Sequence, residues 1–136
     1  MKNYVLDANA LVRFFRNQEG AARVRELFVQ ADKNQASLRI SLVNLSEVLY
    51  VYARHSTTEE ARNAIYRVQG LVEFLAPDTE HALAAGELHH RYELGLADCL
   101  AAELAMRTKA TLVTADPEFA KQGKQLKVLA LPRHSA

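Results

Sequence analysis

The sequence of 136 residues has little of what marks several protein classes. Its single cysteine, Cys99, excludes an internal disulfide framework and suits a reducing cytoplasm. Only three prolines and five glycines occur, and 49% of the residues are apolar, which excludes collagenous, low-complexity and disordered chains. Asp7 interrupts the apolar run near the start, so we expect neither a signal peptide nor a membrane span. We expect a soluble, cytoplasmic protein with one domain over residues 1–136, whose last few residues fray.

An excess of charge of one sign is also missing. The 17 Lys and Arg residues against 16 Asp and Glu residues give a net charge of +1, so no overall field attracts nucleic acid. The glycines are scattered and form no phosphate-binding loop, and the zinc motif H-E-x-x-H and the elbow G-x-S-x-G are absent. These absences disfavour nucleotide cofactors, zinc peptidases and acyl hydrolases. Cys99 has no evident His partner, which favours a packing role for it.

The sequence does contain an alternation of strand-like and helical segments. Short apolar or alternating runs predict strands at residues 3–6, 37–41, 72–76, 110–114 and 127–131. Helical spacing of apolar residues predicts helices at 8–15, 21–31, 42–55, 79–92 and 97–108. A further helix is expected after the capping box of Thr57 and Glu60, and a polar helical segment before the last strand. We therefore predict a three-layer α/β/α fold with a central, mostly parallel sheet of about five short strands.

Two acidic residues stand at or just after the ends of predicted strands. Asp7 follows the first strand and Asp116 follows the fourth, which is where open parallel sheets build their binding sites. Each also has a local explanation, since both can cap the next helix and Asp98 can interact with a helix dipole in its first turn. Glu47 lies about two turns inside its helix and can cap nothing, so a solvated position at the edge of an apolar stripe is its simplest alternative.

The conjunction of these four carboxylates is more informative than any one of them. If they converge to about 5 Å, each like-charged pair costs roughly 3 kcal/mol at an effective dielectric constant near 20. Such a cluster needs cations or protons, and oxygen-rich acidic sites suit Mg²⁺ or Mn²⁺. Two such ions can generate a nucleophile and stabilise the leaving oxygen of a phosphodiester. The acids therefore predict hydrolytic cleavage of nucleic acid.

The segments around the acids resemble motifs of the PIN domain, and in particular of VapC-like toxin ribonucleases of bacterial toxin–antitoxin pairs. The matching segments are YVLDANALV, NLSEVLY, GLADCLAAELA and TLVTADPEF, in the order that the family has. The resemblance implies an endoribonuclease that depends on Mg²⁺ or Mn²⁺ and acts on RNA. Its catalytic and metal-binding residues would be the four acids, Asp7, Glu47, Asp98 and Asp116. It also implies a homodimer and a small cognate antitoxin whose tail covers the acidic groove.

Supporting residues follow from the same resemblance. Thr114 would position Asp116 or a water molecule, and Asn44 would stand beside Glu47. Asn9 is a departure, because many relatives carry Ser or Thr at that position, although an amide can still form hydrogen bonds.

Basic residues near the first acid are candidates for contact with the RNA backbone. Arg13 and Arg16 follow Asp7 within the first predicted helix, and Arg39 is a weaker candidate. For each of them, a solvated surface position is the simpler alternative.

Two other functions stay open at this point. A phosphoacceptor signalling domain shares the length, the parallel sheet and clustered acids, but it needs a phosphorylatable Asp after a central strand and a Lys after the last strand. A non-catalytic module of the same fold could bind RNA or a protein without cutting. A phosphatase of the D-x-D type is disfavoured, because its second Asp is replaced by Asn9.

Overall fold

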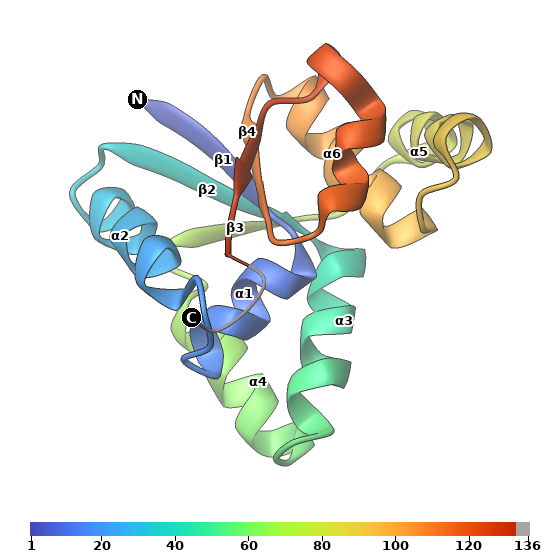
Figure 1. Cartoon of the computed structure of the whole chain (residues 1–136). Coiled ribbons are helices and arrows are strands. Elements are labelled where there is room, and N and C mark those ends of the chain that lie inside the picture. The colour runs from blue at the N-terminus through green and yellow to red at the C-terminus, as the bar shows by residue number, and fades with distance from the viewer. Residues whose placement is uncertain (133–136) are drawn as a thin grey trace.

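The computed structural model describes residues 1–132 (Figure 1). Its strands are β1 (Lys2–Leu6), β2 (Ala36–Ser41), β3 (Val72–Leu75), β4 (Thr111–Thr114) and β5 (Val128–Ala130). Its helices are α1 (Ala8–Phe15), α2 (Ala21–Asp32), α3 (Leu42–Ala53), α4 (Thr58–Arg67), α5 (Thr79–Tyr92), α6 (Leu96–Arg107) and the 3₁₀ helix η1 (Pro117–Gln125). The predicted fraying concerns the final residues 133–136, which lie outside the described part. Within that part, no helix combines the length and the apolar character needed to cross a membrane.

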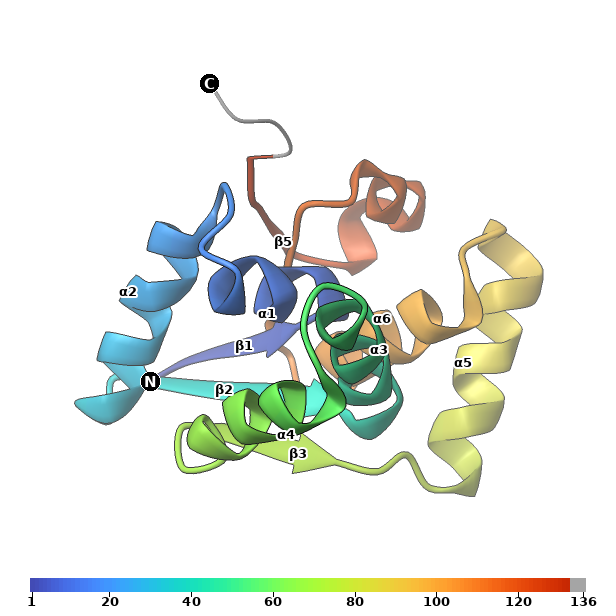
Figure 2. The same cartoon turned by 90° about the horizontal axis from the view of Figure 1, so that it is seen from below.

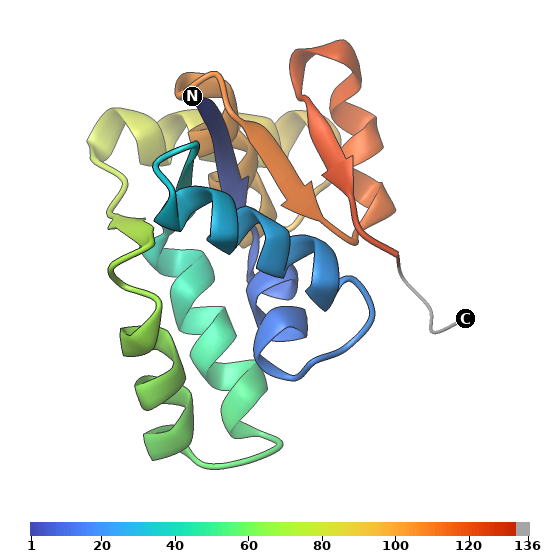
Figure 3. The ribbon, with the colours of Figure 1, turned by 90° about the vertical axis from the view of Figure 1, so that its left-hand side faces the viewer.

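The five strands form one parallel sheet in the order β3-β2-β1-β4-β5. The first strand of the chain lies in the middle, where Val5 pairs with Arg39 of β2 on one side and Leu112 of β4 on the other. The arrowheads of β1, β4 and β5 accordingly point the same way in Figure 3. The predicted α/β class with a central sheet is confirmed, and every strand pairing is parallel.

Alternation along the strands divides the apolar core between the two faces of the sheet. Tyr4 and Leu6 of β1 belong to a cluster with α1, α2, α3 and α4, whereas Val5 belongs to a second cluster with α5, α6 and η1. This is the period of two that a strand buried on both faces requires. Figure 3 shows α2 in front of the strands and α5 and α6 behind them, which gives the predicted three layers.

Several helices pack against one another as well as on the sheet. Helix α3 lies beside both α1 and α4, and it also contacts α6 across the edge of the sheet. Helix α5 packs on α6, at the opposite end of the molecule from α2 (Figure 2). The free thiol of Cys99 is fully buried in the second cluster, so its predicted packing role is confirmed.

The strand order reverses direction between β1 and β4. From β1 the chain proceeds to β2 and then β3 on one side, while β4 and β5 lie on the other side. Helices that leave β1 and β4 therefore diverge at the carboxyl ends of these two neighbouring strands. Such a reversal of strand order is the usual place for a binding site in an open α/β sheet.

Candidate metal centre

Two of the four predicted acids begin the segments that follow the central strands. Asp7 is the N-cap of α1, and its Oδ1 accepts a hydrogen bond of 2.8 Å from the backbone N–H of Ala10. Asp116 is the N-cap of η1, and its Oδ1 accepts a hydrogen bond of 2.9 Å from the N–H of Glu118. The caps predicted from sequence are thus present. They also fix both carboxyl groups at the carboxyl edge of the sheet.

The other two acids come from helices that meet at the same edge. Asp98 lies in the first turn of α6, after Gly95, and Glu47 lies in the middle of α3. A Cβ on Gly95 would stand 3.4 Å from Asp98 Oδ2, so a glycine leaves room for this carboxylate. Both Asp98 and Glu47 are half-buried.

All four carboxylates line one hollow of about 380 Å³ at this edge. Its wall is completed by two small residues, an amide and one basic residue, namely Ala8, Ala115, Asn9 and Arg13. The structure therefore brings together the acids that the sequence distributes over more than a hundred positions. Neither His nor Cys contributes to the wall among residues 1–132.

Burial makes three of these acids hard to ionise, and repulsion between neighbouring charges adds to this at Asp7 and Asp98. Burial raises the pKa of Asp7 to about 7, with the charges of Asp98 and Asp116 contributing in the same direction. The pKa of Asp98 rises to about 6, mainly through burial, and then through the neighbouring charges of Asp116 and Glu47. Burial also raises the pKa of Glu47. A bound cation would reverse this trend, since an opposite charge favours the ionised form.

Thr114 joins the two strand-end acids from the last residue of β4. Its hydroxyl forms a hydrogen bond with the carboxylate of Asp7, which lowers the pKa of that group and so opposes the effect of burial. The same oxygen accepts a hydrogen bond of 2.9 Å from the backbone N–H of Asp116. Thr114 is only 1% exposed. A positioning role of Thr114 toward Asp116 stays a prediction, and the link to Asp7 was not foreseen from the sequence.

The chemistry of this donor set fits Mg²⁺ or Mn²⁺. Both are hard cations that prefer oxygen ligands, and Mg²⁺ usually keeps several waters while one or two carboxylates bind it. In the described residues, no three His, Cys, Asp or Glu side chains are already arranged to hold one ion. The carboxylates instead surround a space larger than one ion, which leaves room for bound waters or for two ions. Asp7, Glu47, Asp98 and Asp116 are the residues that could hold them.

Of the three basic candidates for contact with RNA, only one lines the acidic hollow. Arg13 lines the hollow, where its Nε donates to Asn9 Oδ1 at 2.8 Å and its Nη1 donates to the carbonyl oxygens of Glu19 and Pro132. Arg16 is exposed and is not among the lining residues. Arg39 lies on β2 and forms an ion pair with Glu73 of β3, at 3.1 Å.

Two features of the site were missed or incompletely described by sequence reasoning. The charge of Glu118 acts on Asp98, so a fifth acid stands near the hollow, and the only signal for it is its place just after Asp116. Asn44, predicted to stand beside Glu47, is 1% exposed and donates from Nδ2 to the carbonyl oxygen of Ala97 at 3.1 Å. It is not among the residues that line the hollow.

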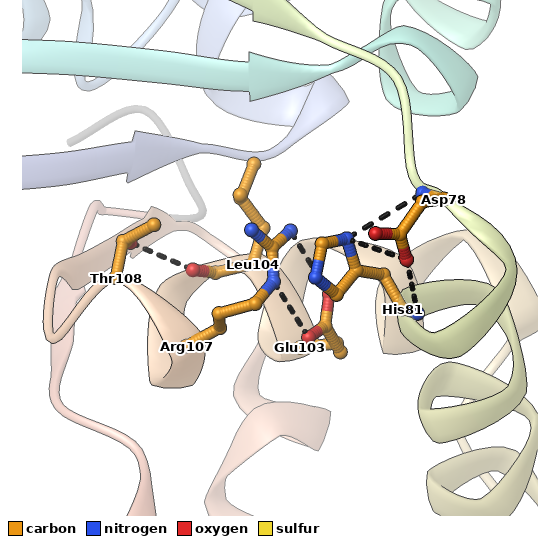
Figure 4. Close-up of polar contacts among 6 residues, drawn as sticks. All are labelled: Asp78, His81, Glu103, Leu104, Arg107 and Thr108. Carbon is orange, nitrogen blue, oxygen red and sulfur yellow. Dashed lines mark hydrogen bonds and ion pairs between the residues drawn. The ribbon is translucent and has the colours of Figure 1, made fainter.

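A larger hollow of about 1190 Å³ lies between α5 and α6, and one of its acids forms an ion pair. Figure 4 shows Arg107 directed at Glu103, with Nε–Oε2 at 2.9 Å and Nη2–Oε1 at 3.3 Å. Nearby, Asp78 and His81 form the capping box of α5. The larger hollow is lined by only two acids, Glu87 and Glu103, and Glu103 is paired with Arg107, so the smaller hollow with its four acids is the better candidate site.

Comparison with known proteins gives one family and several similar folds. The PIN domain family model matches residues 4–125, which confirms the resemblance read from the four motifs. No curated protein sequence gives a significant match.

Solved structures with a similar fold cover nearly the whole chain. VapBC2 from Rickettsia felis, bound to a promoter DNA fragment, is 22% identical with a TM-score of 0.74, covering 95% of this chain and 98% of that chain. DNA-bound VapBC from Salmonella typhimurium is 20% identical with a TM-score of 0.73, covering 96% and 98%. A toxin-antitoxin complex from Klebsiella pneumoniae is 18% identical with a TM-score of 0.70, covering 93% and 96%. At these identities the similarity concerns the fold, and the family rests on the match over residues 4–125: the chain belongs to the PIN domain family.

Proposed function

We propose that this PIN domain is a divalent-metal-dependent endoribonuclease that hydrolyses RNA phosphodiester bonds. One observation carries the proposal: four carboxylates from four separate segments line a single hollow at the carboxyl edge of the sheet. Folding raises the pKa of three of them, which is unfavourable at neutral pH unless a cation is present. Stability alone gives no reason to gather such groups, so a ligand of opposite charge is the physical explanation.

Asp7, Glu47, Asp98 and Asp116 would hold Mg²⁺ or Mn²⁺ in this hollow. Bound ions of this kind neutralise phosphate charge and activate water for attack on a phosphodiester. The residues of the chain would keep the acids ionised and in place. Thr114 does so through its hydrogen bonds to Asp7 and to the backbone of Asp116.

RNA is the proposed substrate, and two arginines would contact its backbone. Arg13 stands in the wall of the acidic hollow, and Arg16 follows three positions later, at the C-cap of α1. Their positive charge would offset the repulsion between RNA phosphates and the carboxylates. Asn9, whose Oδ1 accepts from Arg13, would help to orient that side chain.

We further propose that the chain is the toxin of a toxin–antitoxin pair, acts in the cytoplasm and forms a homodimer. The support is the PIN domain family and a fold shared with VapBC proteins and with a toxin-antitoxin complex. The cognate partner would be a small antitoxin protein that covers the acidic hollow. Sedimentation equilibrium would test the dimer, and copurification of one defined small polypeptide that blocks RNA cleavage would test the antitoxin.

Cleavage of defined RNAs tests the central proposal. The purified chain is incubated with an RNA panel in EDTA, in Mg²⁺ and in Mn²⁺, and products are mapped to the nucleotide. Cleavage is expected only with a metal ion and is expected to disappear in Asp7→Asn. Asp32→Asn is the matched control, because Asp32 is an exposed residue at the end of α2, just before the amino end of β2, whereas the four acids lie at the carboxyl ends of the strands.

The other outcomes are equally specific. Equal cleavage by Asp7→Asn would implicate a contaminant. RNA binding without cleavage in any metal would favour the non-catalytic module. A stable acyl-phosphate on Asp7 or Asp78 after incubation with a small phosphodonor would favour the phosphoacceptor domain.

A further inference from the structure

A buried amide links the two helices that carry Glu47 and Asp98. Asn44 lies on α3 one turn before Glu47, so the two side chains are on neighbouring positions of the helix surface. Its Nδ2 donates to the carbonyl oxygen of Ala97 at 3.1 Å, and that carbonyl belongs to the peptide bond that joins Ala97 to Asp98. Among the described residues, this is the only hydrogen bond between α3 and α6.

The same amide is costly to bury. Asn44 is 1% exposed, yet its Oδ1 accepts no hydrogen bond from any residue that the structure describes. A buried acceptor without a partner destabilises the fold, and an apolar side chain of similar size would avoid that cost. Its orientation is fixed, because the opposite rotation would place two oxygens against each other at Ala97. The residue is therefore poorly explained as core packing alone.

The hydrogen bond from Asn44 lies where two carboxylates repel one another. Glu47 and Asp98 line the same hollow from α3 and α6, which contact each other, so their negative charges repel one another there. The charge of Glu47 accordingly raises the pKa of Asp98. Repulsion between them tends to separate the helices at this point. The Asn44 amide opposes that separation one turn from Glu47 and one peptide bond from Asp98.

We infer that Asn44 is a positioning residue that sets the spacing between Glu47 and Asp98 and thereby the affinity of the acidic hollow for a divalent cation. The inference rests on the proposed function, since it concerns the same hollow. It assigns no contact between Asn44 and the ion. Groups that orient metal ligands in this way commonly change metal affinity by ten- to a hundredfold when they are removed.

Asn44→Leu tests this with the full-length chain and Mn²⁺ alone. Leucine has the branched shape and the number of heavy atoms of asparagine and removes both the donor and the unpaired acceptor, so the apparent Tm should stay the same or rise. The Mn²⁺ dissociation constant, measured by titration calorimetry, should increase about tenfold or more. Ser46→Ala is the matched control, because the Ser46 hydroxyl bonds only to the Val43 carbonyl of its own helix; it should leave Mn²⁺ affinity unchanged.

A second measurement needs no metal. Amide hydrogen exchange in EDTA should be faster in the first turn of α6 in Asn44→Leu than in the unsubstituted chain, and unchanged in Ser46→Ala. If Asn44→Leu does not fold, Asn44→Ala serves for the same comparisons. Mn²⁺ affinity that Asn44→Leu leaves unchanged would overturn the inference alone. Failure of the unsubstituted chain to bind Mn²⁺ would refute the proposed metal centre and, with it, the inference.

Discussion

The ionisation of Asp7 should destabilise the metal-free fold, and Asp7→Asn should remove that cost. The carboxyl group is 3% exposed and its pKa is raised from 3.8 to about 7 by burial. Asparagine resembles the protonated acid and caps helices as well as aspartate does, so the hydrogen bond from Ala10 can be kept. The substitution therefore changes charge with little change in shape.

The sign and size of the effect follow from proton linkage. Between pH 4 and 7 the folded chain holds the Asp7 proton that the unfolded chain has released, so the free energy of unfolding falls as pH rises through this window. A shift from 3.8 to about 7 corresponds to about 4 kcal/mol at most. We expect Asp7→Asn to be more stable than the unsubstituted chain by about 2 to 4 kcal/mol at pH 8, and equally stable near pH 4.

Urea denaturation in EDTA at pH 4, 6 and 8 measures this difference. Asp78→Asn is the matched control, since Asp78 caps α5 in the same way, through a 2.9 Å bond from the His81 N–H, but lies at an exposed position. It should change the free energy of unfolding by less than about 0.5 kcal/mol. Saturating Mn²⁺ should stabilise the unsubstituted chain and not Asp7→Asn. An Asp7→Asn chain that is less stable than the unsubstituted one at pH 8 in EDTA would refute the reasoning.

Three further predictions concern single contacts. Thr114→Val removes a hydrogen bond to the Asp7 carboxylate, so the pKa of Asp7 should rise by about one further unit, which a carbon-detected NMR titration in EDTA would measure. Arg16→Ala should weaken RNA binding and reduce the slope of log affinity against log salt by about one, and an unchanged slope would remove Arg16 from the interface. Arg107→Met leaves Glu103 without its ion pair, so thermal unfolding should show a loss of about 1 to 3 kcal/mol while Mn²⁺ affinity stays unchanged.

The elements of the fold were predictable because their signals are local. Apolar runs and caps such as Ser41 and Thr57 identify strands and helix starts within a window of a few residues. Bounds differ slightly, for example α3, which ends at Ala53 and not at residue 55. The polar segment before the last strand is a 3₁₀ helix interrupted at Gly123, whose φ of 65° is incompatible with a continuous helix. The order of the strands has no such local signal, because the same pattern of elements is compatible with several crossover orders.

The contacts that organise the site join residues far apart in the sequence, so they also lack a local signal. Asn44 bonds to a backbone carbonyl 53 positions away, and Arg13 to one 119 positions away. A carbonyl has no side-chain signature, so nothing at Ala97 or Pro132 marks it as a partner. The four acids could be selected because their predicted strand and helix positions were informative, and Thr114 and Asn44 could be named as supporting residues from the same motifs. The groups that these side chains contact, Asp7 for Thr114 and the Ala97 carbonyl for Asn44, could be found only from the folded chain.

For Asp7 and Asp116, the capping role and the proposed metal-binding role support each other. A carboxylate offers two oxygens and about four acceptor positions, and the cap bonds from Ala10 and from Glu118 each use only one oxygen, Oδ1. The cap holds each side chain at the start of a helical segment, where the partial positive charge of the helix offsets part of the repulsion between neighbouring acids. Because β1 and β4 are parallel neighbours, both capped starts lie at the same edge of the sheet. A cap that follows each of two adjacent parallel strands is therefore enough to bring two carboxylates together with acceptor capacity to spare, and α3 and α6 need to add only one acid each to complete an anionic hollow.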